Sequence, residues 1–481
     1  MHGPHAIVFG AEEISEGDSQ AHFGFVGTTG SGKTLLMRVL SQSTLCHVGK
    51  GLGYRGLVYD AKQDAMPLLS AYIERERLYT FNPFDARGVA WDIAADINEP
   101  RVALETAYSL VPEISESQPY FANAARHLTY GVILSFMLRQ LDWTLSDVVR
   151  ALSSSSRCRR VLEQHEYTSD IIRHYFRDKR LLNDIFSTVA TKMLLYEPIA
   201  GCWDRAEYRI SMQTWSEQEL VLVLGNTEVS RSAIDNINRC IFKRASDLIL
   251  AKPESPDERS WFFIDEVSEA GRLPLTSLLK KGRSKGGRVA IAFQSISGLR
   301  DAKLFGQYQT DDILGQIGNR FFGRIECPET AEHAARVIGE QEILQTSKSE
   351  TKTTQGTSKT KNVNHVLRRA VLPSEFMSVT PCDFQNGLTG MFTTRSGRPA
   401  WDRISPHELS SMVLPPAADV PDFVPRDPFA QLVLPWTEAE EAEFAPRLSI
   451  SERQLMKRKR RQRTDQKSKP QSLSDIDLNI S

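Results

Sequence analysis

The sequence has few cysteines, no long apolar run and almost no net charge. Its six cysteines, at positions 46, 158, 202, 240, 327 and 382, are far apart and form no C-x-x-C pair. This spacing argues against a zinc site and a disulfide framework, and it fits a reducing compartment. The most apolar stretches, near 128–138 and 220–225, are shorter than the roughly 18 residues of a spanning helix, and the N-terminus lacks the apolar core of a signal peptide. We therefore expect a soluble, cytoplasmic chain.

The charges are nearly balanced over the whole chain. There are 59 Lys and Arg against 60 Asp and Glu, a formal net charge of −1. No overall basic field draws such a chain to nucleic acid, so any site for a polyanion must be local. With 481 residues, of which 41% are hydrophobic and 25% charged, the composition is that of a globular protein of about three domains.

A glycine-rich stretch near the N-terminus predicts a nucleotide site. The segment "GFVGTTGSGKT" has the G-x-x-x-x-G-K-[ST] spacing of a phosphate-binding loop, and it lies between an expected strand, His22–Val26, and an expected helix that includes Leu35–Leu40. The N–H groups of such a loop turn toward the β-phosphate, and the helix presents its positive end. Lys33 is expected on the phosphates and Thr34 on Mg²⁺. The expected nucleotide-binding residues are Gly27, Thr28, Thr29, Gly30, Ser31, Gly32, Lys33 and Thr34.

A second strand supplies another candidate for the nucleotide site. Leu57–Tyr59 is a short apolar strand, and Asp60 follows at its carboxyl end with Lys62 two positions later. Ligands of open α/β sheets gather at that edge, which makes Asp60 and Lys62 candidates to face the nucleotide, with Asp60 as a candidate nucleotide-binding residue. A strand-end aspartate also caps the helix that follows it. The sequence leaves both roles open for Asp60.

Two adjacent carboxylates predict hydrolysis. Trp261–Ile264 is an apolar strand that ends in Asp265 and Glu266. Two acids directly after a buried strand are costly unless a metal or a proton transfer uses them. We expect Asp265 to hold Mg²⁺ and Glu266 to polarise the attacking water. Together with Lys33 they indicate an ATPase.

The next strand carries a candidate sensor of the phosphate. Arg288–Phe293, "RVAIAF", ends at Gln294. A polar side chain at the tip of this core strand can contact both the γ-phosphate and the attacking water. The alternative is that Gln294 belongs only to a turn at the end of the strand.

The pattern along the chain predicts an α/β nucleotide fold that is interrupted by a helical domain. We expect residues 1–97 and 216–415 to form the nucleotide-binding domain, and residues 98–215 to form an inserted all-α domain with helical stretches such as "ANAARHLTYGVILSFMLRQL". Residues 345–363, rich in Ser, Thr and Lys, are expected to be a flexible loop. Residues 416–481 are expected to be a disordered or partner-binding tail.

The C-terminal region contains one strongly basic motif. The run "KRKRRQR", Lys457–Arg463, follows an acidic patch at Glu438–Glu443. Such a run suits contact with DNA or an anionic membrane, and a solvated tail is the alternative.

These motifs resemble the type IV secretion coupling proteins, the TraD/TraG-type ATPases of the FtsK–HerA class of motor proteins. The resemblance extends from about His22 to Pro399. The stretches that carry it are "HFGFVGTTGSGKT", "VYDAKQD" followed by "FNPFDARGVAWDI", "FFIDEVSEAGRLPLTSLLKKGRSKGGRVAIAFQSISGLRD" and "PETAEHAARVIGEQE".

The resemblance implies a fold, an assembly and residue roles. It implies a RecA-like P-loop core that carries the all-α domain, and a ring-shaped homo-hexamer with ATP and Mg²⁺ between neighbours and DNA, bound without sequence preference, in a central channel. By position it makes Asp265 and Glu266 the hydrolytic acids and Gln294 the sensor. Arg283, in "KKGRSKGG", matches the arginine finger that the family inserts into the adjacent subunit's site. The alternative for Arg283 is a solvated basic helix end.

The resemblance also gives the expected function. Most members of the family begin with two membrane-spanning helices, and no such segment is found in this sequence. We expect an ATP-driven DNA translocase that delivers DNA with its relaxase to a secretion channel, cytoplasmic and held at the inner membrane through partners. The alternatives are a soluble DNA-processing or defence ATPase, and a nucleotide-switched docking adaptor that moves no DNA. Stimulation of ATP turnover by DNA distinguishes the motor from the adaptor.

Overall fold

The computed structural model describes residues 7–112, 119–255, 257–353, 356–449, 451, 452 and 454. The chain divides into two compact units. The first contains Met1–Asn82, Thr214–Asn226 and Ile241–Val424, and the second contains Pro83–Gln213, Thr227–Cys240 and Pro425–Ser481.

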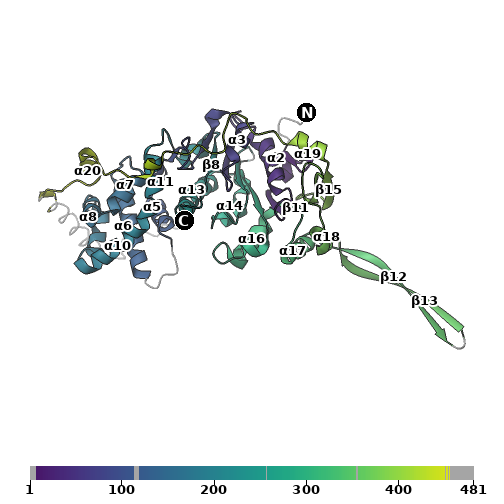
Figure 1. Cartoon of the computed structure of the whole chain (residues 1–481). Coiled ribbons are helices and arrows are strands. Elements are labelled where there is room, and N and C mark those ends of the chain that lie inside the picture. Colours follow the sequence, from purple (N-terminus) through teal and green to yellow (C-terminus); the bar gives the residue numbers. More distant parts are fainter. Residues whose placement is uncertain are drawn as a thin grey trace, which may run out of the picture. The chain divides into compact units, whose positions relative to one another are not determined.

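The first unit is built on a nine-stranded sheet (Figure 1) with the order β15-β14-β11-β3-β10-β9-β4-β8-β5. Neighbouring strands from β11 to β5 pair in parallel, and β14 and β15 add an antiparallel edge. The strands are β3 (His22–Val26), β4 (Tyr54–Tyr59), β5 (Leu78–Thr80), β8 (Val221–Leu224), β9 (Arg259–Ile264), β10 (Gly287–Phe293), β11 (Ile317–Phe322), β14 (Leu388–Thr393) and β15 (Ala400–Ile404).

Helices and two hairpins complete the first unit. The helices are α1 (Glu16–Ser19), α2 (Lys33–Leu45), α3 (Ala65–Ser70), η1 (Arg75–Arg77), α14 (Leu275–Lys281), η2 (Arg283–Lys285), α15 (Ile296–Leu299), α16 (Gly306–Gln316), α17 (Pro328–Ile338), α18 (Pro373–Met377) and α19 (Pro406–Met412). The hairpins are β1 (Ile7–Phe9) with β2 (Glu12–Ile14), and β12 (Glu340–Thr353) with β13 (Gly356–Arg369). Two helices, α12 (Met212–Glu217) and α13 (Arg231–Ala251), contain residues of both units.

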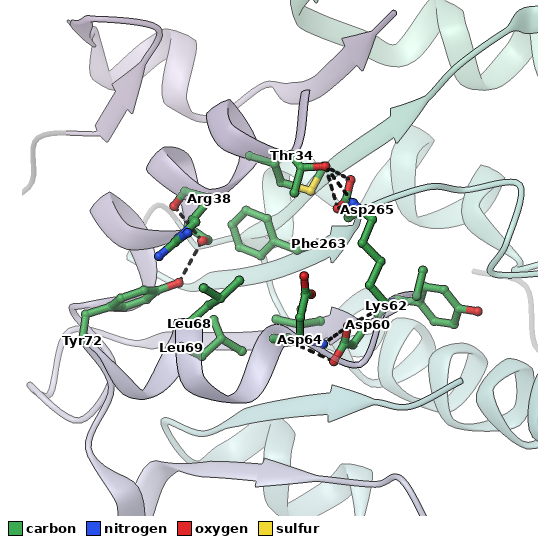
Figure 2. Close-up of a pocket in the computed structure, with 16 residues that line it drawn as sticks. Thr34, Arg38, Asp60, Lys62, Asp64, Leu68, Leu69, Tyr72, Phe263 and Asp265 are labelled. Atoms are coloured by element: carbon green, nitrogen blue, oxygen red, sulfur yellow. Dashed lines mark hydrogen bonds and ion pairs between the residues drawn. The ribbon is translucent and has the colours of Figure 1, made fainter. Parts of the chain in front are cut away.

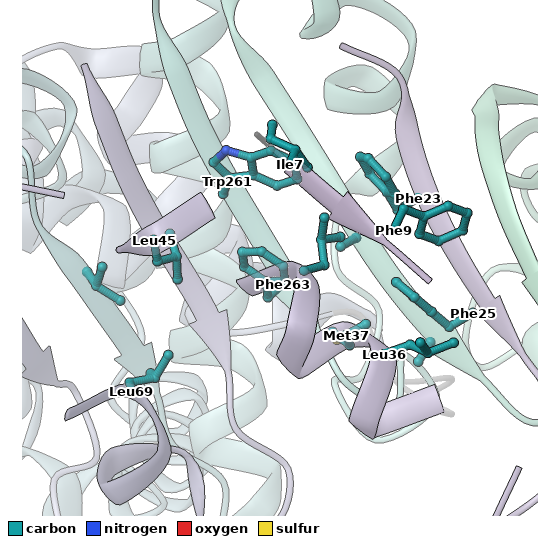
Figure 3. Packing of buried hydrophobic residues seen from close by; sticks show 14 of the residues in the cluster. Ile7, Phe9, Phe23, Phe25, Leu36, Met37, Leu45, Leu69, Trp261 and Phe263 are labelled. Carbon is teal, nitrogen blue, oxygen red and sulfur yellow. The ribbon is translucent and has the colours of Figure 1, made fainter. Parts of the chain in front are cut away.

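One face of the sheet is buried under α2 (Figure 3). Phe23 and Phe25 of β3 and Trp261 and Phe263 of β9 lie on this face, because side chains two positions apart in a strand point to the same side. Leu36 on the first turns of α2 packs into the same cluster. This contact fixes the start of α2, and with it the end of the phosphate loop, against the sheet.

The other face of the sheet is buried as well. Phe262, between the two aromatic residues of β9 on the first face, packs edge-on against Trp215 and Phe242, with ring centroids 5.7 and 5.4 Å apart. Parallel sheets are usually covered on both faces, which explains why the last four residues of β9, Trp261–Ile264, are all apolar instead of alternating with polar residues. The expected α/β fold class is confirmed, and the strands expected before the phosphate loop and before Asp265 are present.

The segment expected to be a flexible loop, residues 345–363, instead belongs to the long hairpin of β12 and β13. The pairing is continuous from Glu340↔Arg369 to Thr353↔Gly356. The loop was expected because the segment is polar. The segment is also rich in threonine, a β-branched residue that favours strands. Figure 1 shows the hairpin extending beyond α17 and α18.

The second unit is mainly helical. Its longest helix, α6, packs against α5, α7, α8, α9 and α10. None of the helices within the described residues combines the length and the hydropathy needed to cross a membrane. The elements are β6 (Ala90–Trp91), α4 (Ile93–Asp96), α5 (Pro100–Leu110), α6 (Pro119–Leu138), α7 (Leu145–Leu152), α8 (Ser155–Glu163), α9 (Glu166–Tyr175), α10 (Lys179–Leu194), α11 (Glu197–Asp204), β7 (Arg209–Ile210), η3 (Pro428–Gln431) and α20 (Glu438–Phe444).

The first part of the C-terminal region packs onto this helical unit. Trp436 is buried, and its indole N–H donates to Asp147 at 2.7 Å. Phe444 stacks on Trp436 and meets Phe136 of α6 edge-on. Residues 425–449 are therefore an ordered part of the unit. The basic run Lys457–Arg463 lies outside the described residues.

Candidate functional site

The phosphate loop joins the end of β3 to the start of α2. Gly27, Gly30 and Gly32 have φ angles of 156°, 74° and 92°, in the region that favours glycine. A Cβ at Gly27 would lie 2.6 Å from Ser31 Oγ, and one at Gly32 would lie 2.3 Å from Leu388 Cδ1. Gly27 and Gly32 therefore require glycine for space as well as for backbone conformation.

The loop is held from outside by two distant segments. The Thr28 N–H donates to the Arg324 carbonyl at 2.7 Å, and the Cys382 N–H donates to the Gly30 carbonyl at 2.8 Å. Arg324 follows β11, the neighbour of β3 in the sheet. The loop is thus tied to the polypeptide on both sides of its turn, and its shape does not depend on the local sequence alone.

Lys33 and Thr34 occupy the first turn of α2, where the helix cannot provide acceptors for its own N–H groups. Lys33 is buried, and its ammonium donates to the carbonyls of Gly27 at 2.6 Å and Thr28 at 3.0 Å. Burial lowers the pKa of Lys33, while the nearby Glu266 and Asp265 oppose that shift. The Thr34 hydroxyl donates to the Asp265 carboxylate at 3.0 Å, so the two expected Mg²⁺ ligands are in contact.

Glu266 is held in an unusual backbone conformation next to Asp265. Its φ is 81°, which costs a residue with a side chain about 1–3 kcal/mol and is typical of functional sites. Ser268 donates to one carboxylate oxygen of Glu266 at 2.6 Å, and Gln294 donates to the other at 3.0 Å. The expected hydrolytic acid and the expected sensor are therefore in direct contact.

These side chains line a single pocket of about 550 Å³, a volume within the usual range for small-molecule sites. It is bounded by Thr29 to Thr34 of the loop and by the acids after β9. The Ser31 hydroxyl is buried and has no hydrogen-bond partner among the described residues, and Gly27 and Gly32 form a cradle that a Cβ would fill. The Thr34 hydroxyl and the Asp265 carboxylate are the oxygen ligands that Mg²⁺ prefers. The residues therefore fit a nucleotide with Mg²⁺.

Lys62 lies beside the two candidate metal ligands (Figure 2). Its ammonium is 3.3 Å from the Thr34 hydroxyl and 3.6 Å from an Asp265 carboxylate oxygen. Sequence reasoning placed Lys62 near the nucleotide but gave it no role. Its ammonium is a positive charge at the position where Thr34 and Asp265 would hold a metal ion.

Asp60 caps the helix that follows its strand. Its carboxylate accepts the N–H groups of Lys62 at 3.3 Å, Asp64 at 3.3 Å and Ala65 at 3.1 Å (Figure 2). Burial raises the pKa of Asp60 to about 6. Of the two roles left open by the sequence, the structure shows the capping role for this side chain, and contact with the nucleotide stays a prediction.

Arg283 lies apart from the other candidate residues. It is in η2 and lines a pocket with His22, the first residue of β3, whereas the phosphate loop follows the last residue of that strand. The five residues of β3 span about 13 Å from first to last, so Arg283 and the phosphate loop lie at opposite ends of the strands. Arg283 therefore cannot reach a nucleotide bound at the phosphate loop of its own chain. If it acts on a nucleotide, that nucleotide is bound by another molecule.

A model of the type IV secretion-system coupling protein DNA-binding domain matches residues 7–400. This match covers most of the chain and includes every residue of the pocket described above. The chain belongs to this coupling-protein family.

Individual relatives agree with this assignment. The coupling protein TraD of Escherichia coli (strain K12) is 24% identical over 340 residues, which cover 67% of this chain and 44% of TraD. The chain thus spans less than half the length of that relative. The unbound conjugative coupling protein TrwB has a TM-score of 0.66 at 19% identity, with 88% of this chain and 92% of that chain covered. TrwB in complex with ADP and Mg²⁺ has a TM-score of 0.64 at 19% identity, with 89% and 94% covered. These solved structures support the fold.

Some residues of the coupling-protein site were not found from the sequence. Ser268, which orients Glu266, is two positions after it, and a serine after an acid carries no signal of its own. Cys382 contacts the loop from the other end of the sequence, and only the fold brings the two together. Arg38 lines the pocket one turn after Thr34, and its spacing on α2 is the sequence signal that would have identified it.

Proposed function

We propose that this chain is an ATP-hydrolysing motor that moves DNA as a coupling protein in conjugative or related type IV secretion. The observation that carries the proposal is the arrangement of Glu266, held by Gln294 and Ser268, beside the Asp265–Thr34 pair. A site that only binds nucleotide needs the lysine and the metal ligands, but it has no use for a second, separately oriented carboxylate. TrwB has been solved with ADP and Mg²⁺, with a non-hydrolysable ATP analogue and with a non-hydrolysable GTP analogue, which supports binding of a purine nucleotide with Mg²⁺ at this site.

Each residue has a role in the proposed reaction. Lys33, which donates to the loop carbonyls, is placed to turn its ammonium toward the phosphates, and the loop N–H groups stabilise their negative charge. Mg²⁺, when bound to Thr34 and Asp265, neutralises charge on the phosphate oxygens. Glu266 accepts a proton from a water that attacks the γ-phosphorus, while the bond to the bridging oxygen breaks and ADP leaves. Gln294 orients Glu266 and the water through its amide.

Arg283 completes the site from a second copy of the chain. Its place at the opposite edge of the sheet supports action in trans, where a guanidinium neutralises charge that develops on the γ-phosphoryl group. Hydrolysis then depends on assembly, and a homo-hexameric ring is the assembly that we propose. We also propose that the unit built on the nine-stranded sheet is a RecA-like motor domain, and that the helical unit, which includes Pro83–Gln213, is the all-α domain that it carries.

DNA, a relaxase and secretion-channel proteins are the proposed partners. The DNA-binding description of the family supports DNA as the cargo, and contact through phosphates makes the binding independent of sequence and steeply sensitive to salt. We propose that the chain acts at the cytoplasmic side of the inner membrane through these partners.

Replacing the proposed hydrolytic acid tests the reaction. Glu266→Gln is expected to bind ATP with Mg²⁺ as the wild type does, because the amide keeps the shape of the side chain, and to lose at least about a hundredfold in turnover because it accepts no proton. Glu269→Gln, which neutralises another carboxylate of the same pocket, is the matched control and keeps most of the turnover. Equal turnover of Glu266→Gln and the wild type would contradict the assigned chemistry.

A further inference from the structure

A second pocket lies at the edge of the sheet opposite the phosphate loop. It has a volume of about 460 Å³ and is formed where β3 and β11 begin, beside the end of α14, η2 and the end of α16. Its lining includes four basic residues, Lys280, Lys281, Arg283 and Arg395, and no acidic residue. A chain with a net charge of −1 thus concentrates positive charge at one hollow.

Most of this charge is not balanced by ion pairs. Lys280 pairs with Asp312 at 2.7 Å. Lys281, Arg283 and Arg395 have no ion pair within the part of the chain that the structure describes. Asp18 is close enough to Arg395 to be affected by its charge, but its carboxylate already accepts hydrogen bonds from Ser15 and from the Ser396 N–H and hydroxyl.

A buried arginine adds to the positive potential behind the pocket. Arg288 is 3% exposed, and its guanidinium donates to the carbonyl oxygens of Arg283 at 3.2 Å and Gly287 at 3.4 Å. No carboxylate pairs with it among the described residues. Burial lowers its pKa to about 10, with nearby Arg259 opposing its charge, so it stays a cation at neutral pH.

The backbone that carries these cations is fixed in place. His22 joins three elements, because one ring nitrogen bonds to the Leu279 carbonyl of α14 at 2.9 Å and the other accepts the Val289 N–H of β10 at 3.1 Å. Burial lowers the pKa of His22 to about 4, so the ring is neutral and holds the structure without adding charge. The turn after Arg283 ends at Gly286, with φ 82°, where a Cβ would lie 2.2 Å from the Glu258 carbonyl.

We propose that this pocket is a second phosphate-binding site, in which Lys281 and Arg395 join Arg283 in binding a phosphate group supplied by another molecule. The phosphates at the chain's own loop are about the length of β3 away and cannot enter it. The source is a nucleotide held by a second copy of the chain or the backbone of a nucleic acid, which share the same oxyanion chemistry. Which of the two sources supplies the phosphate depends on the proposed function. The phosphate-binding site itself is inferred from the pocket and does not depend on that function.

Neutral variants of the two new residues test the site. Lys281→Gln and Arg395→Gln remove exposed charges, and the backbone N–H of Arg395, which bonds to Asn319, is unaffected. Lys50→Gln is the matched control, because Lys50 is an exposed lysine outside the lining of the pocket. All variants are compared with the wild type for melting temperature before use.

Two measurements separate the sources. Sedimentation velocity with Mg²⁺ and a non-hydrolysable ATP analogue reports assembly between copies. Fluorescence anisotropy of labelled single-stranded and duplex oligonucleotides, titrated at several salt concentrations, reports nucleic-acid contact. For a nucleotide of a second copy, both variants raise the protein concentration of half-assembly on the order of tenfold. For nucleic acid, each lost contact reduces the slope of log affinity against log salt by about 0.9 for duplex and about 0.7 for single strands.

Either change supports the site and identifies its source. Variants that match Lys50→Gln and the wild type in both measurements overturn the inference, and so does a wild type that responds in neither, because no phosphate then enters the pocket. A different result would contradict the proposed function, namely wild-type ATP turnover that does not respond to DNA. In that case the assembly measurement still shows whether the pocket binds a phosphate.

Discussion

The Lys62 ammonium lies where a metal ion held by Thr34 and Asp265 would bind, and this gives a quantitative prediction. The ammonium lies 3.3 Å from the Thr34 hydroxyl and 3.6 Å from the Asp265 carboxylate. A metal ion held by these two ligands would bring a second positive charge to the same place. Lys62 must therefore move away when the metal binds, and removing its side chain is expected to strengthen metal binding.

The size of the effect follows from the exposure of the pair. Two unit charges at 3.6 Å interact with about 1.2 kcal/mol in water and several times more in a protein interior. The Lys62 side chain is 56% exposed and that of Asp265 25%, so solvent screens the pair. Exposed pairs contribute about 0.2–1 kcal/mol, which corresponds to a change of about 1.5- to 5-fold in affinity.

The assay measures binding of fluorescent ADP against Mg²⁺ concentration. For Lys62→Gln we expect half-maximal binding at a Mg²⁺ concentration about 1.5- to 5-fold lower than for the wild type, and no shift for Lys50→Gln, an exposed lysine outside the pocket. A midpoint that is unchanged or moves to higher Mg²⁺ would refute the competition, and the second outcome would make Lys62 a phosphate ligand instead.

Three further predictions concern the loop, the cap and the helical unit. Gly32→Ala is expected to lower the melting temperature further than Gly30→Ala, because a Cβ at Gly32 meets a buried side chain while none lies within 4 Å at Gly30; equal shifts in differential scanning fluorimetry would contradict this. Asp60→Asn is expected to gain stability relative to the wild type as pH rises from about 4 to above 6, by at most about 3 kcal/mol. The reason is that the folded chain holds the Asp60 proton more tightly than the unfolded chain, so the wild type loses stability as pH rises through the folded pKa of about 6; a difference in melting temperature that is constant from pH 4.5 to 8 would argue against it. Trp436→Ala removes a buried ring and its hydrogen bond and is expected to destabilise the helical unit by about 3–5 kcal/mol, seen as faster proteolytic release of residues 425–449.

The parts of the fold that could be predicted are those with local signals. The strand His22–Val26, the glycine loop and the start of α2 are contiguous, and each has its own pattern of apolar residues, glycines and lysine. The acids at the end of β9 were recognised in the same way, because a buried strand followed by two carboxylates is unusual. The contact between Asp265 and Thr34 agrees with the rule that the carboxyl ends of parallel strands meet at one edge of the sheet.

The parts that were not predicted depend on long-range contacts, or have a composition that is compatible with more than one structure. Threonine-rich residues 345–363 suit both a loop and a ribbon, and only the pairing of β12 with β13 decides between them. Residues 425–449 are short segments whose order comes from Trp436 and Phe444 packing on distant helices. Asp60 shows the same limit at the site, because the sequence placed it at the strand end without deciding which N–H groups it would accept.

Steady-state ATP turnover, measured with and without DNA over a range of protein concentrations, tests the central claim most directly. A motor whose site is completed by Arg283 of a second copy predicts turnover that rises cooperatively with protein concentration, increases with DNA, and is lost in Lys33→Ala and Arg283→Ala. Turnover that is proportional to protein concentration, indifferent to DNA and unchanged in Arg283→Ala would contradict the account.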